Sequence, residues 1–119
     1  RVHIPRPQER PQLSVAWETF VKAPRLLIRL KAKNLPQRPA RSMTLRVFGM
    51  ALGQPRRNLA EWSLAPNAGG EFDRSLSVVV GRAYSDVCVV ASISSREPEC
   101  PAPVEDGTVW TQLAIPPAQ

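Results

Sequence analysis

The sequence predicts an all-β fold, a single-domain β-sandwich of about seven short strands. Apolar and polar residues alternate with period two in segments of strand length, and glycine, proline and asparagine separate these segments. Thirteen prolines in 119 residues also interrupt the chain too often for long helices. A chain of this length forms one domain with its own core. We therefore expect a flexible, proline-rich tail over residues 1–12 and the sandwich over residues 13–119.

The clearest alternation lies in residues 25–33, where Leu26, Ile28 and Leu30 share one side and basic residues the other, with Leu27 as the exception. The expected strands cover residues 13–21, 25–33, 43–52, 59–64, 72–80, 84–93 and 108–115. The residues expected in the core are Leu26, Ile28, Leu30, Leu45, Val47, Leu76, Val78, Val87, Val89, Ile93 and Leu113.

The net charge of +6 is unevenly distributed along the chain. Residues 1–57 carry thirteen Arg and Lys against two acidic residues, whereas residues 58–119 carry three Arg against eight acidic residues. This distribution indicates either a basic face for an anionic partner or a solvated surface whose halves attract each other. Binding of single-stranded nucleic acid would need exposed aromatic rings beside the basic row, and only Phe48 is placed near it. We expect no nucleic-acid partner.

Residue types that carry catalysis or bind metals are scarce. His3 is the only histidine and lies in the expected tail, so no rigid base can be paired with a nucleophile. Two acidic pairs, Glu97 with Glu99 and Glu105 with Asp106, lie in a proline-rich loop, where solvated charge is their expected role. Calcium-loop and phosphate-loop motifs are missing. We expect no metal, no cofactor and no enzymatic activity.

The two cysteines are Cys88, in an expected strand, and Cys100, in the proline-rich loop after it. In an oxidising compartment they can form a disulfide, which would stabilise the fold by about 3 kcal/mol through loop closure. The alternative is a buried thiol at Cys88 and an exposed one at Cys100.

The start of the sequence favours an exported protein. It opens at Arg1 into a polar, proline-punctuated stretch, as the processed form of an exported protein would. No apolar run is long enough to span a bilayer, so we expect a soluble domain.

Several segments between Pro24 and Ile93 together resemble one known family. They read Pro-Arg-Leu-Leu-Ile-Arg-Leu, Leu-Arg-Val-Phe, Ala-Glu-Trp-Ser-Leu, Gly-Gly-Glu-Phe-Asp, and Tyr84 leading into Cys-Val-Val-Ala-Ser-Ile. The pattern resembles the YscW/ExsB-type pilotins, small outer-membrane lipoproteins of type III secretion systems with a β-sandwich plan.

The resemblance implies a function as well as a fold. A pilotin binds the C-terminal segment of a secretin, carries the secretin to the outer membrane and promotes assembly of its ring. The resemblance also implies a signal peptide and a lipidated cysteine upstream of Arg1, which would hold the protein at the periplasmic face of the outer membrane. We expect a monomer that reaches the membrane only through this anchor.

The sequence also offers a candidate surface for the secretin segment, because the strand expected over residues 43–52 is apolar on both faces. Its second face and Leu27 would form an exposed apolar strip rimmed by basic residues. The expected partner-binding residues are Leu27, Arg29, Arg46, Phe48 and Met50, with Leu52 and Arg25 beside them. The alternative is that a second sheet or the loop over residues 94–107 covers this strip.

Two other functions fit the same sequence features. One is the lipoprotein that anchors the type VI secretion membrane complex, which is also a small β-sandwich but has a different partner. The other is a periplasmic ligand-binding module that would use Trp17, Trp62 and Trp110 as a saccharide-binding face, although tryptophans in a domain of this size usually lie in the core.

Overall fold

A computed structural model describes residues 11–18, 23–32, 42–67, 71–81, 83–93, 99–100 and 107–116. Its strands are β1 (Gln12–Glu18), β2 (Arg25–Ala32), β3 (Met43–Met50), β4 (Arg57–Leu64), β5 (Phe72–Val79), β6 (Asp86–Ser92) and β7 (Thr108–Ala114). β1 begins at the last residue of the expected tail, and the rest of that tail except Pro11 lies outside the described residues.

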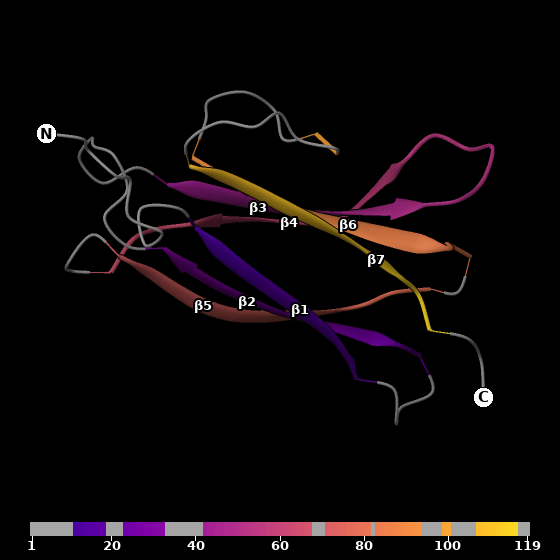
Figure 1. Ribbon diagram of the computed structural model, residues 1–119, viewed down its shortest axis with the longest axis horizontal. Helices are drawn as coiled ribbons and strands as arrows, with labels where there is room; N and C mark the ends of the chain where they lie inside the picture. Colours follow the sequence, from indigo (N-terminus) through magenta and orange to yellow (C-terminus); the bar gives the residue numbers. More distant parts are fainter. Residues whose placement is uncertain are drawn as a thin grey trace, which may run out of the picture.

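The strands form two antiparallel sheets that lie face to face (Figure 1). Sheet A has three strands in the order β1-β2-β5, and sheet B has four in the order β4-β3-β6-β7. The protein is therefore an all-β sandwich, as the sequence predicted. The chain crosses from sheet A to sheet B between β2 and β3, returns for β5, and crosses again before β6.

The core lies between the sheets and is built from one alternating row on each strand. In β2, Leu26, Ile28 and Leu30 are almost fully buried, while Leu27 and Arg29 between them are exposed. Leu45 and Val47 of β3 enter the same cluster from sheet B. Burial of such side chains stabilises the fold by roughly 1.5–3 kcal/mol for each one, so the period-two pattern fixes which face of each strand points inward.

Four of the expected core residues are only partly buried: Leu76, Val78, Ile93 and Leu113. Leu76 and Val78 lie on β5 and Leu113 on β7, which are edge strands, and Ile93 follows the end of β6. An edge strand has a neighbour on one side only, so its inward side chains remain partly open to solvent. The prediction of burial therefore holds only in part at these positions, and for the three residues on edge strands the reason is that strand order cannot be read from periodicity.

Most expected strand boundaries agree with the structure to within two residues. β3 ends at Met50 and not at residue 52, because a turn follows in which the Gln54 amide donates to the Ala51 carbonyl at 3.1 Å and Gly53 has φ 74°. The predicted continuation of the first strand over residues 19–21 lies outside the described residues.

Two polar contacts connect the sheets at their sides. Arg74 interrupts the inward row of β5, and its guanidinium donates to the Ala65 carbonyl at 3.0 Å and to Asn67 Oδ1 at 3.2 Å in the connection after β4. At the opposite side, Trp17 Nε1 of β1 donates to the Ala114 carbonyl of β7 at 2.9 Å. These bonds lie in exposed positions, so each contributes little to stability, but they link the margins of the two sheets.

Replacing Leu45 by alanine should lower the free energy of unfolding by about 3–4 kcal/mol, because the side chain is fully buried and a cavity would remain. The same change at the half-buried Leu113 should cost roughly 1–2 kcal/mol. Urea unfolding of both variants checks the difference, and equal losses would contradict the placement of β7 at an edge.

Candidate functional site

The five expected partner-binding residues divide between two opposite surfaces. Leu27 and Arg29 of β2 lie on the outer face of sheet A. Arg46, Phe48 and Met50 of β3 lie on the outer face of sheet B, because they pair with the outward residues of β6. The single exposed strip predicted from these residues is therefore wrong: β2 and β3 belong to different sheets, whose outer faces point away from each other.

Phe48 is covered, although it points outward from sheet B. Only 5% of it is exposed, and it forms a small buried cluster with Cys88, Val90 and Cys100, against which Met50 packs. Cys100 belongs to the loop that the sequence offered as an alternative cover. Leu52, in contrast, is 98% exposed in the turn after β3.

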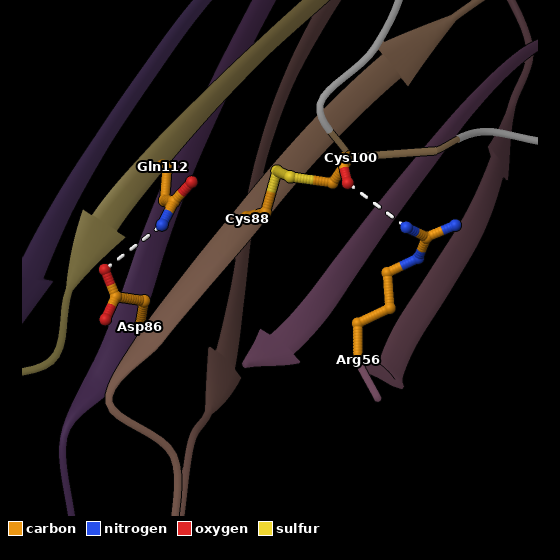
Figure 2. The surroundings of a disulfide bond; sticks show 5 residues. All are labelled: Arg56, Asp86, Cys88, Cys100 and Gln112. Atoms are coloured by element: carbon orange, nitrogen blue, oxygen red, sulfur yellow. Dashed lines mark hydrogen bonds between the residues drawn. A yellow bond between two sulfur atoms is a disulfide. The ribbon is translucent and has the colours of Figure 1, made fainter. Parts of the chain in front are cut away.

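A disulfide holds this cover in place. Cys88 of β6 and Cys100 are bonded, the pairing that the sequence suggested, with a Cα–Cα distance of 6.4 Å (Figure 2). Both residues are almost fully buried. Because the bond closes a short loop, it both restricts the unfolded chain and keeps the Cys100 segment over sheet B.

Two arginines complete the surroundings of Phe48. The guanidinium carbons of Arg46 and Arg56 lie 5.8 and 5.2 Å from the ring centroid, within the range of cation–π attraction. Arg56 Nη1 also donates to the Cys100 carbonyl at 3.1 Å (Figure 2). Arg46 forms an ion pair with Glu61 of β4, its cross-strand neighbour. These arginines therefore close the cluster and do not form the rim of an open site.

The outer face of sheet A, in contrast, has an open groove of about 480 Å³. Cross-strand pairing places Arg29 between Ser14 and Ser75, and Leu27 between Ala16 and Ser77. The small side chains of β1 and β5 leave space on both sides of the longer ones of β2. Leu27 remains 37% exposed in this groove. The result is a mainly apolar hollow edged by hydroxyl groups and one guanidinium.

The charges beside the groove are paired but accessible. Arg29 Nη2 lies 3.0 Å from Asp73 Oδ1, and the two side chains are 50% and 51% exposed. Lys31 is the direct cross-strand partner of Asp73, and Arg29 reaches Asp73 diagonally from its position opposite Ser75. An exposed pair of this kind contributes at most about 1 kcal/mol, so a carboxylate from a partner can replace Asp73 at Arg29 at little cost.

The sequence did not identify the serines and Ala16 as lining residues. Their signal was present in the outward positions of the first and fifth strands, which carry small side chains where surface strands usually carry longer ones. These small residues indicate a groove only when the strand pairing is known, because the pairing places Ser14, Arg29 and Ser75 in one row.

The tryptophans do not form a common face. Trp17 and Trp62 point toward the core and pack against it, whereas Trp110 lies on the outer face of sheet B, paired with Val90. Across the described ranges, no group of three or more His, Cys, Asp and Glu side chains is arranged to hold a metal ion. Within the same ranges there is no helix both long and apolar enough to cross a bilayer. His3 and both acidic pairs, apart from Glu99, lie outside the described residues.

Phe48→Asp should unfold the protein or cost at least about 3 kcal/mol, because it buries a carboxylate in place of a packed ring. Leu52→Asp is the matched control and should change the melting temperature little, since that side chain is almost fully exposed. Thermal melts followed by circular dichroism separate the two variants. A stable, native-like Phe48→Asp protein would contradict the buried position of the ring.

Removing the disulfide with Cys88→Ala and Cys100→Ala together should lower the free energy of unfolding by about 3 kcal/mol.

In the wild type, both half-cystines are too buried for dithiothreitol to attack unless the structure first opens locally. Once the dithiothreitol has been removed, thiol titration should therefore detect no free thiols in protein treated in native buffer, and two in protein treated in denaturant. Rapid reduction of the native protein would argue against a buried bond.

Comparison with known proteins adds no assignment. The chain matches no protein-family model, no curated protein and no solved structure. The sandwich, the covered face of sheet B and the open groove on sheet A are therefore the features from which a function has to be inferred.

Proposed function

We propose that this chain is a non-catalytic binding domain that receives a segment of a partner protein in the groove on the outer face of sheet A. We further propose that the partner is a secretin, that the bound segment is its C-terminal tail, and that the domain acts as a pilotin in type III secretion. In this role it would be held at the periplasmic face of the outer membrane by a lipid anchor.

The groove is the observation that carries this proposal. It is an open, mainly apolar hollow lined by the exposed Leu27, and no residue that the structure describes shields this side chain fully from water. Burying such a side chain under a partner contributes favourably to binding at roughly 25 cal/mol for each Å². A surface with this shape favours recognition of an apolar side chain over chemistry on a substrate.

The form of the bound segment follows from the position of β2. This strand is central in sheet A and pairs with β1 over residues 25–31 and with β5 over residues 25–32, so its backbone is not available for an added strand. Recognition in the groove must therefore use side chains. We expect the segment to lie across the face, with an apolar residue against Leu27.

The charge pattern adds a second requirement for the partner. Arg29 borders the groove, and Ser14 and Ser75 present hydroxyl groups on either side of it. A carboxylate of the partner, either an acidic side chain or the chain terminus, would satisfy the guanidinium and these hydroxyls together. The segment that fits best thus combines an apolar anchor with a negative charge nearby.

The test is an isothermal calorimetric titration of the domain with a synthetic peptide. The peptide is the C-terminal tail of the secretin whose gene lies beside the gene of this chain. Micromolar or tighter binding is expected for the wild type. Leu27→Asp should weaken it by about 2 kcal/mol or more, as loss of a central apolar anchor does, and Arg29→Glu should weaken it by reversing the charge.

Leu52→Asp is the matched control for Leu27→Asp, because it places the same carboxylate on an exposed turn far from the groove. It should bind like the wild type. Binding that survives both groove variants would remove the groove from the proposal, and a folded wild type that ignores every secretin tail offered would end the assignment as a pilotin.

A further inference from the structure

The edges of the two sheets differ in how they are protected against pairing with another strand. Natural edge strands usually carry charges, prolines or bulges that block such pairing. β4 carries Arg57 and Glu61, and its pairing with β3 is interrupted by a register shift. β5 carries Asp73 and Arg74. Both edges on this side of the sandwich are thus protected.

The edge strand β7 has none of these devices. All its residues, Thr108–Ala114, are uncharged, none is proline, and its pairing with β6 runs without a register shift. Threonine, valine, tryptophan and leucine are residues that favour extended structure. Its neighbour across the sandwich, β1, carries a charge only at its end, Glu18. Within the part of the chain that the structure describes, β7 is therefore an uncharged strand paired with another strand on one side only, and the Ala114 carbonyl accepts the Trp17 indole.

From this edge we infer that two copies of the chain associate through antiparallel pairing of β7 with β7, so that sheet B of one copy continues into sheet B of the other. This association replaces the monomer expected from the sequence, goes beyond the proposed function and uses a different surface from the groove. Residues directly opposite each other in an antiparallel pair point to the same face of the sheet, so a register centred on one residue places it opposite its own copy. The two copies are then related by a two-fold axis perpendicular to the sheet, and their inward rows lie on the same side.

The register centred on Trp110 fits the contacts of this strand best. It places Trp110 opposite Trp110 of the second copy, and Val109 opposite Thr111. Aromatic cross-strand pairs are among the more stabilising ones, and Trp110 is 37% exposed on the outer face. This register also leaves out Ala114, whose carbonyl already accepts a hydrogen bond from Trp17.

The same features favour a second copy over a different protein. The chain carries a net charge of +6, so two copies repel each other overall and associate best through a surface without charges. Pairing through β7 brings no charged residue of that strand against another. A charged segment of a different protein would find no opposite charge on this strand, whereas β7 is complementary to itself.

Sedimentation velocity from micromolar to millimolar concentration tests this association. The wild type should form a reversible dimer, and the facing indoles should give an exciton couplet in the circular dichroism spectrum that disappears on dilution. Trp110→Lys should weaken association by roughly tenfold or more, because it removes the aromatic pair and opposes two charges. Ser63→Lys, an exposed change on the protected edge β4 of the same sheet, should leave association unchanged.

A second variant keeps the test valid if Trp110→Lys is poorly folded. Gln112 donates to Asp86 Oδ2 at 3.2 Å, so a lysine at this position can keep that contact as an ion pair while adding a charge to the edge (Figure 2). Gln112→Lys should also weaken the dimer. A wild type that stays monomeric at millimolar concentration, or a dimer that survives both lysine variants or is lost equally in Ser63→Lys, would overturn the inference.

Discussion

Packing of the inward rows of β2, β3 and β6 against one another is the interaction on which the rest of the structure depends. These are the inner strands of the two sheets, and their inward residues, such as Ile28, Val47 and Val89, are almost fully removed from water. Because side chains alternate along a strand, the residues between those of an inward row must point outward. The two outer faces, and all that they can bind, follow from that choice.

The two outer faces differ because only sheet B carries a cysteine on an inner strand. The disulfide with Cys88 holds Cys100 against the outer face of sheet B, where these cysteines, Phe48 and Val90 form a second, smaller core. Arg56 strengthens this arrangement by contacting both the ring of Phe48 and the Cys100 carbonyl. Sheet A has no corresponding cover among the described residues, so its apolar residue Leu27 stays accessible in a groove.

The groove and the edge strand β7 serve different kinds of contact. The groove lies over a central strand, so it can offer side chains only, and these combine an apolar floor with a guanidinium. β7 offers backbone groups along an uncharged strand with a neighbour on one side. The two proposed contacts use different residues, so neither would exclude the other.

Local patterns in the amino-acid sequence were enough to predict the secondary structure and the inward rows, because period-two alternation depends only on neighbours along the chain. It also brought Cys88 and Cys100 within plausible reach, since few residues separate them. Which strands are neighbours became known from the folded structure alone. That is why Leu27 and Phe48, both outward and apolar, were expected on one strip but lie on opposite faces, and why Leu113 is only half-buried. Strand order depends on contacts between residues far apart in sequence, which local patterns do not specify.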